Sequence, residues 1–154
     1  MQEVIKVEQL TKSYGKLHAV ENISLSVDRG MVFGLLGANG AGKSTTIECI
    51  LGTKKADTGT IRILGADPFK DRKKLFERVG VQFQESSYQE QITVAELCRV
   101  TASLYKEAAD PFALLARFGI ADKKKSPVKD LSGGQKQRLF IVLALIPDPV
   151  SYTH

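Results

Sequence analysis

A glycine-rich stretch of eight residues is the part of the sequence whose residue types and spacing most clearly indicate chemistry. It consists of Gly37, Ala38, Asn39, Gly40, Ala41, Gly42, Lys43 and Ser44. A glycine, four variable residues and then Gly-Lys-Ser form the spacing of a loop that cradles the phosphates of a nucleotide. Glycines let such a loop curl, so that its backbone N–H groups approach phosphate oxygens.

Two side chains at the end of this loop have complementary roles in that chemistry. The Lys43 ammonium would reach the β- and γ-phosphates, and the Ser44 hydroxyl would hold Mg²⁺. The motif needs a strand before it and a helix after it, and the apolar residues 31–36 predict a buried strand. A helical pattern begins at Thr45, which we count with the phosphate site because a helix N-terminus attracts anions. The sequence therefore predicts a site for a nucleoside triphosphate and Mg²⁺.

A second motif, Leu-Ser-Gly-Gly-Gln, occupies residues 131–135. Ser132 and Gln135 have the spacing of a capping box, which begins a helix. Gly133 and Gly134 would leave the backbone N–H groups of the first turn uncovered, so that an anion could approach them. Alone, the motif fits an ordinary capped helix equally well. It gains weight because a phosphate loop lies upstream in the same chain.

The elements that must position these motifs begin with short antiparallel strands. Alternating apolar residues predict strands at residues 4–10, 23–27 and 60–64. A turn is predicted at residues 13–16, and a hairpin loop at residues 28–30 leads directly into the apolar run before the glycine loop.

The segments after the glycine loop are predicted to alternate and then to become helical. Gly52 is expected to end the first helix, followed later by a helix at residues 69–78 and a strand at residues 79–83. Residues 86–130 are mainly helical by pattern, with a capping box at Thr93 and a helix start at Asp110. The predicted fold class is α/β.

Composition limits the possible classes of protein. The chain has 154 residues, 43% hydrophobic and 25% charged, and a net charge of +5, which is typical of a single globular domain. Its longest apolar run, residues 139–146, is far too short to span a membrane. Lysine runs at residues 70–74 and 123–125 are expected to be solvated faces rather than a nucleic-acid or acidic-lipid surface. Cys49 and Cys98 have no metal-ligand spacing and are expected to fill core space.

Together, the two motifs resemble those of the ATP-binding subunit of ABC transporters, and residues 131–135 match that family's signature motif letter for letter. The resemblance covers residues 4–149 and favours the exporter branch, whose ATPase serves a separate membrane subunit. It implies an ATPase that lies on the cytoplasmic face of the membrane and couples ATP to export. It also implies a P-loop NTPase core with an antiparallel β subdomain and an inserted helical subdomain, at about residues 86–130.

The resemblance assigns roles to further residues. Tyr14 would stack on adenine, although a tyrosine packed in a surface turn is the alternative. Gln84 would reach Mg²⁺ and the attacking water and act with Lys43 in catalysis, although Gln82 lies nearby and Phe83 replaces an expected proline. The signature residues would bind the γ-phosphate of an ATP held by a second subunit, in a head-to-tail dimer with two ATPs. These residues are Ser132, Gly133, Gly134 and Gln135.

The chain departs from the family pattern after Pro149. The family continues with an aliphatic strand, an Asp-Glu pair and a later histidine, whereas no Asp-Glu pair occurs in this sequence. We therefore expect a domain that is incomplete at its C-terminus, over residues 1–149, with a tail of doubtful origin at residues 150–154. Because hydrolysis depends on a positioned water, we expect this chain to hydrolyse ATP poorly. The strands at residues 31–36 and 79–83 are expected to have unpaired edges and exposed apolar surface.

Two other functions remain open from the sequence. One is a soluble ATPase of the same family that acts on nucleic acid or ribosomes, which only the lysine runs support. The other is a nucleotide-binding regulatory module without catalysis.

Overall fold

The computed structural model describes residues 2–82, 89 and 91–147, which form two compact units, Met1–Leu75 and Phe76–His154. Each unit is described by itself. The first contains the elements β1 (Glu3–Tyr14), β2 (Leu17–Asp28), α1 (Lys43–Ile50), β3 (Thr58–Ile63) and α2 (Arg72–Leu75). The second contains the elements α3 (Val94–Ser103), α4 (Pro111–Arg117), η1 (Ala121–Lys123), η2 (Val128–Asp130) and α5 (Gly133–Leu145).

The first unit is built on an antiparallel sheet in the order β2-β1-β3. A two-residue turn joins β1 to β2, and Gly15 at its start has a φ of 58°. Glycine suits such a position because hairpin turns of this length need positive φ angles. The turn predicted at residues 13–16 is confirmed. Both strands of the hairpin extend beyond the apolar alternation, because pairing continues from Tyr14–Leu17 to Glu3–Asp28.

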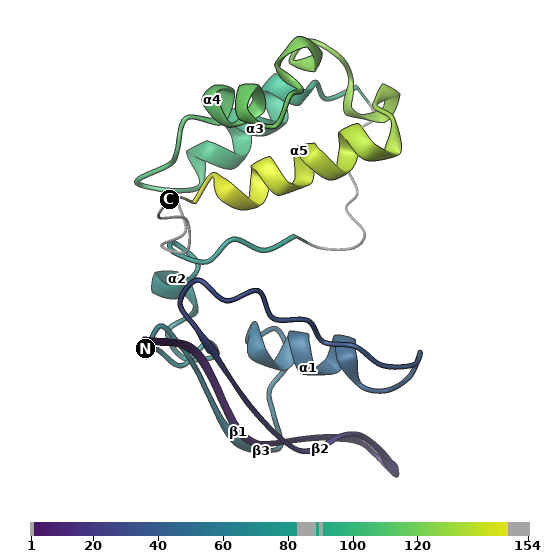
Figure 1. Ribbon diagram of the computed structural model, residues 1–154, viewed down its shortest axis with the longest axis vertical. Helices are drawn as coiled ribbons and strands as arrows, with labels where there is room; N and C mark the ends of the chain where they lie inside the picture. Colours follow the sequence, from purple (N-terminus) through teal and green to yellow (C-terminus); the bar gives the residue numbers. More distant parts are fainter. Residues whose placement is uncertain (1, 83–88, 90, 148–154) are drawn as a thin grey trace. The chain divides into compact units, whose positions relative to one another are not determined.

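Helix α1 lies along one face of this sheet (Figure 1). Its Cys49 packs with Val7, Leu10 and Val20 of the strands in one buried cluster. Gly52 follows the helix with a φ of 64°, and a Cβ atom there would collide with the carbonyl of Pro68. The predicted end of the helix is therefore confirmed, since only glycine fits this crowded left-handed position.

The buried strand predicted at residues 31–36 does not form. The turn after β2 is present, with Met31 N donating to Asp28 O at 3.1 Å, but no strand of the described residues pairs with the segment that follows. Val32 and Leu36 are 101% and 93% exposed. A buried strand needs neighbours that satisfy its N–H and C=O groups, and sequence pattern cannot supply them. The expected exposure of apolar surface is confirmed for residues 31–36, whereas residues 79–81 are half-buried.

The next two predicted elements are also shorter or missing. The helix predicted at residues 69–78 is reduced to α2, because Asp67 holds the chain before it in a turn, accepting from the N–H groups of Phe69 and Lys70. The strand predicted at residues 79–83 is irregular over residues 79–82, and Phe83 lies outside the described residues. A Cβ atom at Gly80 would collide with the carbonyl of Ala144, so this segment packs against α5 without pairing.

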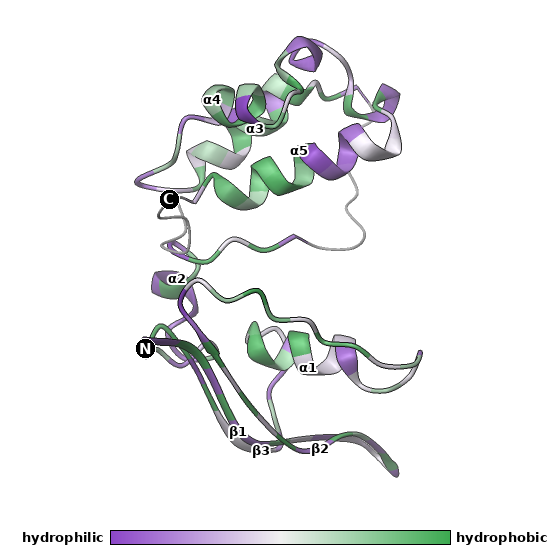
Figure 2. Ribbon diagram, viewed as in Figure 1, coloured by the Kyte–Doolittle hydropathy of each residue, from purple (hydrophilic) through white to green (hydrophobic). Residues whose placement is uncertain are grey.

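The second unit is helical, which confirms the helical pattern predicted for residues 86–130. Capping boxes begin α3 at Thr93 and α5 at Ser132, and Asp110 caps α4. Figure 2 shows that α5 is hydrophilic over its early turns and hydrophobic over its later ones. The buried core consists of Val94, Cys98, Leu115, Ile120, Val128, Leu131, Leu139, Val142 and Ile146. Within the part of the chain that the structure describes, every helix is too short or too polar to cross a bilayer.

Candidate functional site

The glycine loop is fixed against strand β2 at its last glycine. Gly42 is the N-cap of α1 and has a φ of 79°. A Cβ atom on Gly42 would collide with the carbonyl oxygen of Ala19 and lie 3.3 Å from Val20 Cγ2. Only glycine fits here, for both conformational and steric reasons. The close packing fixes the last glycine of the loop beside β2, at the point where the helix begins.

The Lys43 side chain bonds back to the first residues of the glycine loop. Its Nζ donates to Gly37 O at 2.7 Å and to Ala38 O at 2.6 Å, while Ala41 N donates to Ala38 O at 3.2 Å. An ammonium group has three N–H donors, so one donor is left for a ligand. The ammonium is thereby held against the first two residues of the glycine loop and can still donate to a phosphate group.

The first turn of α1 presents one hydroxyl outward and one inward. Ser44 is exposed, whereas Thr46 is 1% exposed and donates through Oγ1 to Gly42 O at 2.9 Å. Thr45, between them, is half-buried. Among the described residues no group of three or more acidic, histidine or cysteine side chains could hold a metal. The role of the exposed Ser44 hydroxyl as a ligand of Mg²⁺ stays a prediction.

Tyr14 is the last residue of β1. It pairs with Leu17, and Ala19, which touches Gly42, is two residues further along β2. At about 3.3 Å per residue, the two contacts are separated by roughly 7 Å along the strand. The Tyr14 ring is 42% exposed, and the Nζ atoms of Lys12 and Lys54 lie 5.4 and 5.3 Å from its centre. The ring predicted to stack on a base is thus accessible and near the loop.

Thr46, Lys12 and Lys54 also belong to this region, although no sequence motif marks them. Thr46 supports the Gly42 carbonyl, and its position in the first helical turn after the loop was the available signal. The two lysines approach Tyr14 from β1 and from the loop after α1, and only the folded sheet brings them together.

The signature motif of the second unit has the geometry of an open helix start. Ser132 Oγ accepts from Gln135 N at 3.3 Å, and Gln135 Oε1 accepts from Ser132 N at 3.0 Å. These bonds use acceptor atoms, so the Ser132 O–H and the Gln135 NH₂ keep donor capacity. Cβ atoms on Gly133 and Gly134 would meet nothing within 4 Å. The helix start therefore presents donors and open backbone, which suits an anion.

The predicted catalytic residue Gln84 lies outside the described residues, so its role stays a prediction. Gln82 is described and is exposed in an irregular segment.

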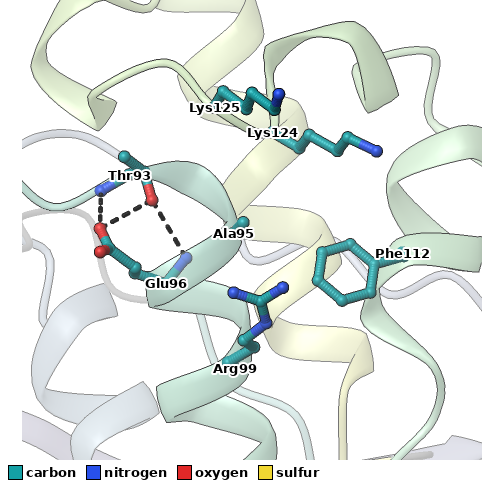
Figure 3. A pocket seen from close by; sticks show the side chains of 7 residues that line it. All are labelled: Thr93, Ala95, Glu96, Arg99, Phe112, Lys124 and Lys125. Carbon is teal, nitrogen blue, oxygen red and sulfur yellow. Dashed lines mark hydrogen bonds between the residues drawn. The ribbon is translucent and has the colours of Figure 1, made fainter.

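A separate pocket in the second unit contains none of the predicted site residues (Figure 3). Its volume is about 560 Å³, and its lining consists of Thr93, Ala95, Glu96, Arg99, Phe112, Lys124 and Lys125. Glu96 is engaged in the capping box of α3, where hydrogen bonds from Thr93 lower the pKa of its carboxyl. The Arg99 guanidinium lies 5.3 Å from the Phe112 ring centre. The helix amides are also engaged, since Ala95 N donates to Lys124 O at 2.9 Å.

The two cysteines are buried and free, which confirms their expected place in the cores. Burial raises the pKa of the Cys98 thiol to about 11, and burial also raises the pKa of Cys49. A thiolate is the reactive form of cysteine, so neither residue is suited to nucleophilic chemistry near neutral pH.

Comparison with known proteins gives one consistent family. A family model described as ABC transporter matches residues 20–151. The chain is 39% identical over 150 residues to a fluoroquinolones export ATP-binding protein of Mycobacterium tuberculosis, covering 96% of this chain and 50% of that protein. It is 35% identical over 153 residues to the bacitracin transport ATP-binding protein BcrA of Bacillus licheniformis, covering 97% and 49%. A methionine import ATP-binding protein of Rhizobium johnstonii is 36% identical, with 96% and 43% covered.

Solved structures agree with the sequence comparisons. The structure of an ATP-binding subunit of an ABC transporter aligns with a TM-score of 0.82 at 28% identity, covering 95% of this chain and 63% of that one. An ATP-binding cassette of another ABC transporter aligns with a TM-score of 0.85 at 27% identity, covering 97% and 67%. The chain spans about half the length of the curated relatives it matches.

Proposed function

The chain belongs to the ABC transporter family, and on that premise we propose that it forms part of an ATP-binding subunit. The subunit couples ATP binding and hydrolysis to the export of a substrate through a partner membrane protein, on the cytoplasmic face of the membrane. Export is supported by the names of relatives that export fluoroquinolones or Nod factors. A methionine importer is also similar, so the direction of transport rests on resemblance to the exporters.

The glycine loop is the observation that carries this proposal. Gly42 packs so closely against β2 that no side chain would fit there, and the Lys43 ammonium donates to two loop carbonyls. In the proposed mechanism the loop N–H groups and Lys43 bind and orient the β- and γ-phosphates of ATP. The Tyr14 ring stacks on the adenine, and the Ser44 hydroxyl holds Mg²⁺, which neutralises phosphate charge when bound.

The signature motif supplies the second half of the proposed site. The donors of Ser132 and Gln135 would contact the γ-phosphate of an ATP bound by another subunit, in a head-to-tail dimer. Loss of the γ-phosphate would remove these contacts and open the dimer, which is how a ligand-dependent equilibrium drives movement in a partner. Gln84 would act at the γ-phosphate and Mg²⁺.

ATP binding is the step to test first. We expect the 154-residue chain to bind MgATP in calorimetry, and Lys43→Ala to weaken binding at least tenfold, because a charge-assisted contact to phosphate contributes about 1.5–3 kcal/mol. Lys55→Ala is the matched control, since Lys55 lies 6.0 Å from the Phe69 ring centre, outside the loop. Equal binding by wild type and Lys43→Ala would contradict the assignment of the loop.

We expect this chain to keep ATP binding but to lose most of its ATP hydrolysis. Because no Asp-Glu pair occurs in the sequence, we expect bound ATP to turn over very slowly. Phosphate release at the rate of a complete family member, lost in Lys43→Ala, would contradict this expectation.

The partner can be tested independently of ATP chemistry. We expect the native protein to co-purify with an integral membrane protein. Co-purification with ribosomes or RNA instead would favour the soluble ATPase that the lysine runs left open.

A further inference from the structure

Two lysine–carboxylate pairs converge on Tyr14 from different parts of the first unit. Lys12 Nζ lies 2.8 Å from Asp57 Oδ1, and Lys54 Nζ lies 2.9 Å from Glu48 Oε2. The same two Nζ atoms lie 5.4 and 5.3 Å from the centre of the Tyr14 ring. Both distances are within the range of a cation–π contact, about 6 Å.

The Asp57 pair is anchored to the backbone of β1. Asp57 Oδ2 accepts from Ser13 N at 2.7 Å, and Asp57 N donates to Thr11 O at 3.0 Å. These bonds fix the carboxylate beside the strand on either side of Lys12. The Lys12 side chain is 17% exposed, so this cation is held by packing as well as by charge.

The Glu48 pair is anchored to the helix that follows the glycine loop. Glu48 lies in α1, and its backbone oxygen accepts from Thr53 N at 2.9 Å and from Lys54 N at 3.1 Å. The segment after α1 therefore folds back onto the helix and brings Lys54 to Tyr14. A continuous set of contacts joins the ring to the element whose first turn carries Lys43 and Ser44.

The hydrogen bonds of these pairs favour the charged forms of the two lysines. The hydrogen bond between Lys12 and Asp57 raises the pKa of the Lys12 ammonium and lowers the pKa of the Asp57 carboxyl. A hydrogen bond to Glu48, and next one to Tyr14, raises the pKa of Lys54. These shifts favour the charged forms of Lys12, Asp57 and Lys54.

We propose that Lys12 and Lys54 are positioning residues for the nucleotide base, which hold the Tyr14 ring in its stacking orientation and link it to the phosphate-binding helix. This inference rests on the proposed function, because it assigns the two lysines to the base-binding part of the same site. A ring that is held before the ligand arrives loses less rotamer freedom on binding, so the gain in affinity is specific to ligands that carry a base. The phosphates alone would gain nothing from it.

The test compares a ligand with a base and a ligand without one. Calorimetry on the 154-residue chain would use MgATP and magnesium tripolyphosphate, with Lys54→Met, Lys12→Met and Tyr14→Ala. Stacking of a base on an aromatic residue contributes about 1–3 kcal/mol, so we expect Tyr14→Ala to weaken MgATP binding about tenfold. Each lysine variant should weaken it about twofold to fivefold, since a cation–π contact is worth about 0.5–1 kcal/mol. Tripolyphosphate binding should be unchanged in all three.

Two control variants separate positioning from general stabilisation. Lys55→Met removes a neighbouring lysine that contacts Phe69 and not Tyr14. It should leave the affinity for both ligands unchanged. Lys54→Arg keeps the cation and should restore MgATP affinity. If Lys54→Met lowers the affinity for both ligands equally, or lowers neither affinity, the inference is overturned.

The proposed function and the further inference fail in different ways. If wild type binds neither ligand, the nucleotide assignment fails and the inference fails with it. If wild type binds both ligands and Tyr14→Ala leaves MgATP affinity intact, phosphate binding stands and only the positioning role is overturned.

Discussion

Two helix starts among the described residues are rich in glycine, and they use glycine for opposite reasons. At the start of α1, Gly42 has a left-handed backbone and faces the carbonyl of Ala19, so that a side chain cannot be accommodated. At the start of α5, Gly133 and Gly134 have open space where a Cβ would lie. Glycine is required by the protein itself in the first case. In the second it matters only for something that approaches from outside.

This difference separates a self-supporting site from one that depends on a partner. In the loop before α1, Lys43 is bonded to two loop carbonyls and Thr46 is bonded to the Gly42 carbonyl. At the start of α5 the capping box uses Ser132 Oγ and Gln135 Oε1 as acceptors, so the Ser132 O–H and the Gln135 NH₂ keep donor capacity. Stability should therefore respond to changes in the first region, and ATP-dependent association should respond to changes in the second.

The largest expected effect is that of Gly42→Ala. Forcing a Cβ against the Ala19 carbonyl at a positive φ should lower the free energy of unfolding by about 2–4 kcal/mol, measured by urea denaturation. Gly40→Ala is the control, because Gly40 has a φ of 84° but nothing within 4 Å of its Cβ position, and it should cost about 1 kcal/mol. Equal effects of the two variants would show that conformation, and not crowding, dominates this loop.

A smaller effect is expected for Ser132→Ala, which removes the cap of α5. Loss of an N-cap should lower the free energy of unfolding by about 1 kcal/mol. Thr93→Ala removes the equivalent cap of α3 and should cost a similar amount. Only Ser132→Ala should also weaken ATP-dependent self-association, measured by light scattering with and without MgATP. Identical association in the two variants would remove the functional distinction between the two caps.

The smallest expected change in stability is that of Gly134→Ala, and its sign is opposite. Alanine favours a helix over glycine, so the free energy of unfolding should rise by about 0.5 kcal/mol. The added methyl group should at the same time block close approach of an anion and reduce ATP-dependent association. A loss of stability in this variant would mean that α5 begins in a more crowded setting than its geometry indicates.

Local sequence signals predicted the helix starts well. Both capping boxes, the Asp110 cap and the Gly52 terminator depend on residues a few positions apart, whose hydrogen bonds form within one turn. The spacing of the glycine loop likewise predicted a helix directly after it, although the pattern began at Thr45 and α1 begins at Lys43. The bonds of Lys43 to the Gly37 and Ala38 carbonyls were not predicted.

Features that depend on distant partners were not predictable from the sequence. The apolar run at residues 31–36 has the composition of a buried strand, yet strand formation requires neighbours whose presence the run itself does not encode. The convergence of Lys12 and Lys54 on Tyr14 depends on the register of β1 and on the fold of the segment after α1. Neither is visible as a local spacing.

The two carbonyl bonds of Lys43 also bear on how quickly the loop can take up a ligand. The ammonium is already held at the loop, bonded to Gly37 O at 2.7 Å and to Ala38 O at 2.6 Å. An incoming phosphate can accept the third N–H of this ammonium while both carbonyl bonds stay in place. Uptake should therefore follow a single concentration-dependent phase in stopped-flow experiments, governed by diffusion and charge attraction.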